Sequence, residues 1–369
     1  WFIVVVKFMK TNKYEIIKQY ILDKILSGDY SVDQKLPTES ELMSAFSVSR
    51  YTVRRAISDL ENENFIYRIQ GGGSFVADKT EILQKESVPQ VVGVISTHIA
   101  SYIFPAIIDG IDQVLSMHNF SFILANTHND PVRERSALKN FMRQNLGGLI
   151  VEPTKSASET TNIDLYKEIE KLGIPVIFIN AAYKNIQGTT LVSDDQHAFY
   201  QATNYLFSKN HKKIVGVFQV DDLQGIQRLD GYLKAYQNHS ELLPFCKPIM
   251  YHSDNVNEAL QQINELLLKT SSERPTAILA YNDQLAIRIM DLVNDIGLKI
   301  PTDVSIIGFD DFQLSKYMSP RLTTMTHAQQ MMGRDAATLL LQKINHHKVD
   351  SVVYESLMVE RDSVRKLKE

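Results

Sequence analysis

Three arginines and a threonine lie close together in one polar stretch, with residue types and spacing that suit contacts to nucleic acid. They are Arg50, Thr52, Arg54 and Arg55. Arg50 and Arg54 are four residues apart, so a helix would project both side chains from one face. Arginine donates two hydrogen bonds to a guanine edge, and arginine and threonine both contact phosphates. The pattern predicts a helix that reads base edges in a major groove, although a solvated helix of another purpose could carry the same residues.

The residues around this cluster predict two short helices joined by a tight turn, after a first amphipathic helix at residues 12–27. Thr38 is followed three positions later by Glu41, which is the capping box that begins a helix. Residues 47–49 would end that helix, and Ser49 can cap the next one. Apolar residues then recur at helical spacing, at Val53, Ala56, Ile57 and Leu60. Such a pair of helices forms a helix-turn-helix.

A glycine-rich hairpin is expected directly after the helix-turn-helix. Residues 65–69 and 74–77 have the composition of two short strands, with Gln70 and three glycines between them. Glycine adopts positive φ and lets the backbone approach a surface closely. A two-stranded hairpin in this place is a wing, and its tip could enter a minor groove.

Residues 13–76 resemble the GntR-type winged helix. The resemblance rests on LPTESEL, VSRYTVRRAI and QGGGSFV in this order, preceded by Tyr14 and Ile21. It implies that the partner is operator DNA. The residues to which it assigns DNA contacts are Lys13, Tyr14, Glu39, Arg50, Thr52, Arg54, Gln70 and Gly71.

Composition indicates a soluble globular protein of two to three domains. The chain has 369 residues, of which 44% are hydrophobic and 22% are charged. Its net charge is −4, so the positive charge for DNA contacts is local rather than spread over a basic domain. The single cysteine, Cys246, excludes an internal disulfide and a cysteine-rich zinc site and fits a reducing cytoplasm. Residues 1–8 are apolar but too short to span a membrane, and we expect them to be an extension upstream of a natural start at Met9.

From residue 91 onward, short apolar runs alternate with amphipathic stretches. Strands are expected at residues 91–96, 121–125, 148–152, 175–180, 213–218, 249–251, 277–280, 305–309 and 352–359, and helices at 105–117, 133–145, 164–172, 196–208, 226–239, 256–269, 284–296 and 329–346. Repeated βα units predict parallel sheets covered on both faces. Two such sets in series predict two α/β lobes across a cleft. The expected domains are a winged helix-turn-helix (α+β) at 9–78, a linker at 79–90 and the two-lobed domain at 91–369.

Polar and aromatic side chains follow the predicted strands, where parallel sheets bind ligands. The set comprises Tyr102, Phe104, Glu152, Lys155, Asn180, Tyr183, Asp221, Asp222, Gln224, Arg228, Asn282, Asp283, Asp310 and Asp311. Carboxylates, amides and an arginine can pair with adjacent hydroxyls while an aromatic face stacks on a ring, so the set suits a sugar. Strand-end Asp and Asn residues often only cap helices, and Asn282 and Asp310 are interpreted as caps.

Residues 91–364 resemble the LacI/GalR-type repressor core, which is similar to periplasmic sugar-binding proteins. The motifs that carry the resemblance are GVISTHIASYIFPAIIDGI, GLIVEPTK, RLDGY, PTAILAYNDQLAI, PTDVSIIGFDD and RLTTMTH. Arg228 and Asp283 match the family's ligand-gripping arginine and aspartate, and His327 lies at the lobe crossover. The implied ligand residues are Tyr102, Phe104, Glu152, Lys155, Asn180, Asp222, Gln224, Arg228, Asp283 and His327. The hinge helix of LacI-type heads is absent, so the resemblance assigns no minor-groove contact to residues 79–90.

A GntR-type head on a LacI/GalR-type core is similar to the arabinose repressors of Gram-positive bacteria, and IASYIFP, GLIVEPTKSA and DDLQG favour that group. The resemblance implies a cytoplasmic homodimeric repressor with L-arabinose as effector and no cofactor. A repressor of the same architecture that responds to another small sugar is the alternative.

Two other classes of protein are disfavoured by the motifs. The acid pairs at residues 194–195, 221–222 and 310–311 could mimic glycosidase carboxylates, but neighbouring acids rarely face one substrate. No G-x-S-x-G, H-E-x-x-H or phosphate-loop motif occurs in the sequence, so we expect no enzyme. A transport-binding protein would suit the core alone, but the DNA-reading head opposes it.

Overall fold

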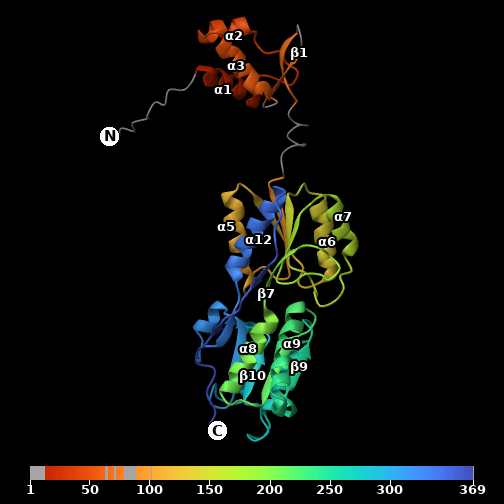
Figure 1. Ribbon diagram of the computed structural model, residues 1–369, viewed down its shortest axis with the longest axis vertical. Helices are drawn as coiled ribbons and strands as arrows, with labels where there is room; N and C mark the ends of the chain where they lie inside the picture. Colours follow the sequence, from red (N-terminus) through yellow and green to blue (C-terminus); the bar gives the residue numbers. More distant parts are fainter. Residues whose placement is uncertain (1–12, 63–64, 70–71, 79–88, 101, 369) are drawn as a thin grey trace, which may run out of the picture. The chain divides into compact units, whose positions relative to one another are not determined.

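The computed structural model describes residues 13–62, 65–69, 72–78, 89–100 and 102–368. These residues belong to two compact units, Trp1–Val88 and Pro89–Glu369 (Figure 1). The wing tip at Gln70 and Gly71, residues 1–8, the helix start at residue 12 and most of the predicted linker lie outside the described residues. No helix among the described residues is long and apolar enough to cross a membrane.

The unit that ends at Val88 is the predicted winged helix-turn-helix. Its elements are α1 (Lys13–Leu26), α2 (Glu39–Phe46), α3 (Arg50–Asn62), β1 (Ile66–Ile69) and β2 (Gly73–Val76). The predicted capping box forms, because Thr38 Oγ1 accepts from the Glu41 N–H at 3.3 Å and the Glu41 carboxylate accepts from the Thr38 N–H at 2.7 Å. Ser49 Oγ caps α3 by accepting from the Thr52 N–H at 3.3 Å. Apolar residues of the three helices and both strands share one buried core.

The first lobe of the second unit is built on a six-stranded sheet of order β13-β7-β6-β5-β3-β4, with parallel neighbours throughout. Its strands are β3 (Val91–Ser96), β4 (Ser121–Asn126), β5 (Gly148–Val151), β6 (Val176–Ile179), β7 (Thr189–Ser193) and β13 (Val352–Tyr354). Helices α5 (Phe104–Met117) and α12 (Gln329–Ile344) share one hydrophobic core, and α6 (Pro131–Met142) and α7 (Ile163–Lys171) share another. Helices thus cover both faces, as predicted.

The second lobe has a six-stranded sheet of order β14-β12-β11-β10-β8-β9, parallel except for the edge strand β14. Its strands are β8 (Ile214–Gln219), β9 (Lys247–Tyr251), β10 (Ala277–Ala280), β11 (Ser305–Asp310), β12 (Thr323–Thr326) and β14 (Met358–Val359). Helices α8 (Asp195–Ser208) and α9 (Leu223–Asn238) pack in one core, and α10 (Val256–Leu267) and α11 (Asp283–Asp295) in the other. The chain passes between the lobes three times, after β7, β12 and β13.

The last predicted strand, at residues 352–359, is wrong as a single element. The structure divides it into β13 at the edge of the first sheet and β14 at the edge of the second. The prediction also omitted β7 and β12, because their sequences TTLVS and TTMT are threonine-rich rather than apolar. In β12 the buried hydroxyl of Thr324 donates to a carboxylate at 2.6 Å, so a polar strand can lie inside the core.

Candidate DNA-reading surface and ligand cavity

Arg50 and Arg54 share one carboxylate on the exposed face of α3. The Nε atoms of Arg50 and Arg54 donate to Glu39 at 2.9 and 3.0 Å, and the hydrogen bond from Arg50 lowers the pKa of Glu39. The two arginine side chains remain 65% and 59% exposed. Exposed ion pairs contribute only about 0–1 kcal/mol, so DNA can compete for these guanidinium groups. The geometry gives Glu39 an orienting position beside the arginines.

Three other described residues to which the resemblance assigns DNA contacts are Thr52, Lys13 and Tyr14. Thr52 Oγ1 lies 2.9 Å from Ser49 Oγ, and Lys13 is exposed at the start of α1. The ring of Tyr14 lies 4.1 Å from the guanidinium carbon of Arg55. Arg55 therefore packs against α1, whereas Arg50 and Arg54 face away from the core.

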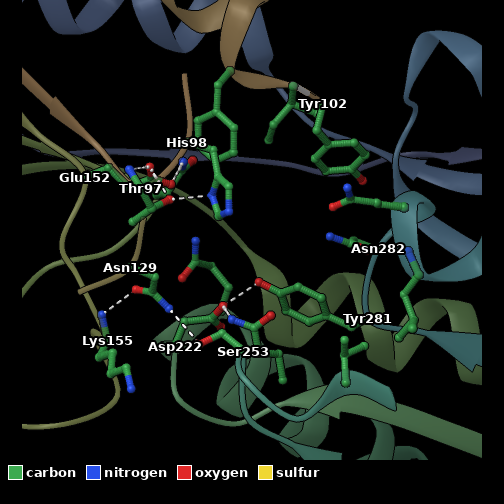
Figure 2. A pocket seen from close by; sticks show the side chains of 18 of the residues that line it. Thr97, His98, Tyr102, Asn129, Glu152, Lys155, Asp222, Ser253, Tyr281 and Asn282 are labelled. Atoms are coloured by element: carbon green, nitrogen blue, oxygen red, sulfur yellow. Dashed lines mark hydrogen bonds between the residues drawn. The ribbon is translucent and has the colours of Figure 1, made fainter. Parts of the chain in front are cut away.

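A cavity of about 540 Å³ lies between the two lobes, at the carboxyl ends of strands from both sheets. The predicted ligand residues that line it are Tyr102, Phe104, Glu152, Lys155, Asn180, Asp222, Gln224, Arg228 and His327. Figure 2 shows His98 and Glu152 of the first lobe facing Tyr281 and Asn282 of the second. The volume of the cavity lies in the range of small-molecule sites, and the lining of the cavity is rich in hydrogen-bonding groups.

Arg228, in the second turn of α9, lines the cavity although only 3% of it is exposed. Its Nε donates to Asp195 at 2.7 Å, and its Nη1 donates to the Tyr281 carbonyl at 2.6 Å. The guanidinium carbon lies 3.7 Å from the centroid of the Phe309 ring, and Nη2 is 4.0 Å from the Asp310 carboxylate. A guanidinium fixed in this way is preorganised to donate to a ligand.

Asp310 lies at the end of β11 and lines the cavity; the short 3-10 helix that follows, Gln313–Lys316, is preceded by Phe312 and has no side-chain cap, so the interpretation of Asp310 as a helix cap is wrong. The hydroxyl of Tyr102 donates to the Asp310 carboxylate and lies 3.0 Å from the backbone nitrogen of Asp283. Tyr102 belongs to the first lobe and both partners to the second, so the phenol bridges the lobes. Burial raises the pKa of Asp310 to about 8, while Arg228 opposes that rise.

A chain of hydrogen bonds runs from the first lobe to the crossover before α12. The Glu152 carboxylate accepts from the Thr97 N–H at 2.8 Å and from Asn180 Nδ2 at 2.9 Å. Asn180 Oδ1 lies 3.1 Å from Nε2 of His327, and burial lowers the pKa of His327 to about 3. The imidazole is therefore neutral, and its Nε2–H donates to Asn180. Protein groups already use part of the hydrogen-bonding capacity of Glu152 and Asn180. These bonds fix the two side chains in the cavity wall, and the remaining lone pairs are free to accept from a ligand.

Asp222 serves as both a helix cap and a wall of the cavity. Its Oδ1 accepts from the Gly225 N–H at 2.7 Å, and its Oδ2 accepts from the Tyr281 hydroxyl at 2.6 Å. Burial raises the pKa of Asp222 to about 7. Phe104 stacks on His98 with ring centroids 5.3 Å apart, which gives the cavity an aromatic face.

The expectation that Asp283 points into the cleft is wrong. Its carboxylate accepts from the Phe312 N–H at 2.8 Å, from Ser315 Oγ at 2.7 Å and from Thr324 Oγ1 at 2.6 Å. Asp283 is fully buried, and the described lining of the cavity does not include it. The side chain instead ties the start of α11 to the segments around β11 and β12.

Asn282, rather than its neighbour Asp283, lines the cavity. It caps α11 by accepting from the Leu285 N–H at 2.8 Å, as predicted, and it also lines the cavity (Figure 2). His98 and Asn129 also line the cavity, and Asp195 is the partner of Arg228, although none of these three roles was predicted. Asn129 could have been found from its place after β4, since that strand also ends at the cleft.

Two family descriptions match separate parts of the chain. Residues 13–76 match the bacterial regulatory proteins of the gntR family, and residues 203–364 match the periplasmic binding protein-like domain. A LacI family transcriptional regulator from Enterococcus faecium with bound ribose has a similar fold, with a TM-score of 0.65 and 24% identity over 75% of this chain and 100% of that one. A DNA-reading winged helix joined to a two-lobed ligand-binding domain defines a ligand-responsive transcriptional regulator.

Full-length relatives make the assignment more specific. The chain is 37% identical to the arabinose metabolism transcriptional repressor of Geobacillus stearothermophilus, over 96% of this chain and 98% of that protein. It is 38% identical to the protein of the same description from Halalkalibacterium halodurans, over 97% and 98%. The chain belongs to the family of arabinose metabolism transcriptional repressors.

Proposed function

We propose that this protein represses arabinose-utilisation genes in the bacterial cytoplasm and is released from operator DNA when L-arabinose occupies the interlobe cavity. The observation that carries the proposal is the buried Arg228, held by Asp195 and the Tyr281 carbonyl with its remaining donors at the cavity wall. A sugar offers adjacent hydroxyls that can accept from Arg228 and donate to carboxylates. Aromatic side chains in the same wall suit the apolar face of the ring.

The effector can displace the protein from DNA only through a difference in its affinity for two conformations. Reversing a population from about 1:99 to 99:1 needs roughly 5.5 kcal/mol. Charge-assisted hydrogen bonds contribute about 1.5–3 kcal/mol each, so a few contacts made only in the closed cavity would be sufficient.

Gel-shift titration of an operator fragment tests the proposal. L-arabinose should release the DNA, and calorimetry with the same sugar should show saturable binding without turnover. If D-ribose or another small sugar released the DNA and L-arabinose did not, the identity of the effector would be wrong, but the proposed mechanism of release would stand. Failure to shift a fragment from its own upstream region would contradict the repressor function itself.

Asp195→Asn is expected to weaken sugar binding by about 10- to 100-fold, because it removes the charge that fixes Arg228, and a tenfold change corresponds to about 1.4 kcal/mol. Calorimetry measures the change. Asp194→Asn is the matched control, since Asp194 is exposed and caps α8 by accepting from the His197 N–H at 3.1 Å, a task asparagine also performs. Equal losses in the two variants would show that the effect is not specific to Arg228.

A regulator that reads two half-sites of an operator needs two linked winged helices, and so a dimer. We propose that the second unit forms this homodimer. Helix α5 exposes Met117 and the start of α12 exposes Met331, with exposed fractions of 74% and 53%. A fragment beginning at Gln90 should therefore sediment as a dimer at micromolar concentration. A fragment that remains monomeric there would contradict this assembly.

A further inference from the structure

The loop after β5 reaches across the cleft and contacts the start of α9 in the other lobe. Ser156 Oγ accepts from the Leu223 N–H at 2.9 Å. The next residue, Ala157, donates its N–H to the Asp221 carbonyl at 3.4 Å. Ser156 is only 4% exposed, and the described lining of the cavity includes its neighbour Lys155 but not Ser156 itself. The contact is therefore distinct from the ligand wall.

This contact satisfies a group that α9 cannot satisfy alone. The first N–H groups of a helix have no partner within the helix. The cap residue Asp222 accepts from Gly225, so the N–H of Leu223, the first residue of α9, receives its acceptor from the other lobe. Helix α9 also carries Gln224 and Arg228, so the loop contacts the helix that presents the arginine.

The loop is held firmly on its own side of the cleft. The Thr154 N–H donates to the fully buried Glu134 carboxylate at 3.1 Å, and the Tyr183 hydroxyl donates to Glu134 at 2.6 Å. The Lys155 N–H donates to Asn129 Oδ1 at 2.8 Å. Because Thr154 and Lys155 anchor this loop to the first lobe, a movement of α9 is coupled to the first lobe and is not absorbed by the loop.

We propose that Ser156 is a positioning residue that caps α9 across the cleft and thereby stabilises the closed arrangement of the lobes. The inference rests on the proposed function in taking L-arabinose as the ligand that closes them. In an open arrangement Ser156 and the Leu223 N–H are both solvated. The bond therefore favours closure, and with it sugar retention, without touching the sugar.

The test uses the full-length protein and the variant Ser156→Ala. Calorimetry should show about three- to tenfold weaker L-arabinose binding, the range expected for one hydrogen bond. Hydrogen exchange should show that the sugar protects the Leu223 amide in the wild type but not in the variant. Melting temperature without sugar should be unchanged. Ser158→Ala is the matched control, because Ser158 is exposed in the same loop.

The outcomes separate the two proposals. Wild-type sugar affinity with a protected Leu223 amide in Ser156→Ala would overturn the role of Ser156. If Arg228→Ala loses the sugar while Ser156→Ala does not, only this inference falls. If the wild type binds no L-arabinose, the proposed effector fails, and the same comparison of Leu223 exchange in wild type and Ser156→Ala, made with a small sugar that calorimetry shows to bind, decides whether the cross-lobe cap forms.

Discussion

Replacing Arg54 with alanine is expected to abolish specific operator binding while leaving sugar binding intact. Arg54 is 59% exposed and lies beside Arg50 on the face of α3 that points away from the core. A bidentate arginine–guanine pair discriminates by about 1–3 kcal/mol, and a dimer loses two such pairs, so the loss is roughly 2–6 kcal/mol. Fluorescence anisotropy with operator and random DNA at fixed salt measures it.

Arg55→Ala provides the matched control for this prediction. Arg55 is the next residue of α3, but its guanidinium lies over the ring of Tyr14, so its loss should change operator affinity only slightly. Discrimination between operator and random DNA should fall in Arg54→Ala. Loss of a phosphate contact would instead reduce the slope of log affinity against log salt concentration by about 0.9 per charge. Retained discrimination in Arg54→Ala would contradict the assignment of α3 as the recognition helix.

Replacing Arg228 with alanine is expected to erase the response to L-arabinose and to leave operator binding normal without sugar. The side chain is the fixed cation of the cavity, and its partners Asp195, Tyr281 and Asp310 all belong to the second unit. Losing two charge-assisted hydrogen bonds removes about 3–6 kcal/mol, comparable with the roughly 5.5 kcal/mol that a full switch needs. Gel-shift titrations with and without sugar measure both properties.

Arg228 also neutralises buried carboxylates, so a second variant separates binding from folding. Arg228→Lys keeps the charge but loses the planar set of donors, and it should bind sugar weakly while melting close to the wild type. Operator release by either variant at wild-type sugar concentration would contradict the site. Loss of operator binding without sugar in Arg228→Ala would mean that the ion pair with Asp195 holds the fold.

The winged helix could be predicted almost completely, because local signals determine it. The capping box at Thr38 and the four-residue spacing of Arg50 and Arg54 depend on residues close together in the sequence. The role of Glu39 was less accessible, since its contact with Arg54 spans 15 positions. The sequence placed Glu39 at the start of α2, but it could not show that this carboxylate pairs with two arginines of α3.

The cavity was predicted in outline, with errors at the turns that follow strands. Asn282 and Asp283 are adjacent at such a turn, and consecutive side chains point in different directions. The pattern therefore could not decide which one faces the ligand. Asp310 was misread for a similar reason, because its partners Tyr102 and Arg228 come from distant segments. Contacts across the cleft, such as Ser156 with Leu223, have no local signature at all.

The three passages of the chain between the lobes have a consequence for how such a protein can be inherited. The DNA-binding unit is one continuous segment that ends at Val88, so a single recombination event could exchange it for another head. Each lobe is assembled from separate segments, since β13 returns to the first sheet and β14 to the second. An exchange of one lobe would need several coordinated breakpoints. Descent should therefore mix heads with cores freely while passing the two lobes on together.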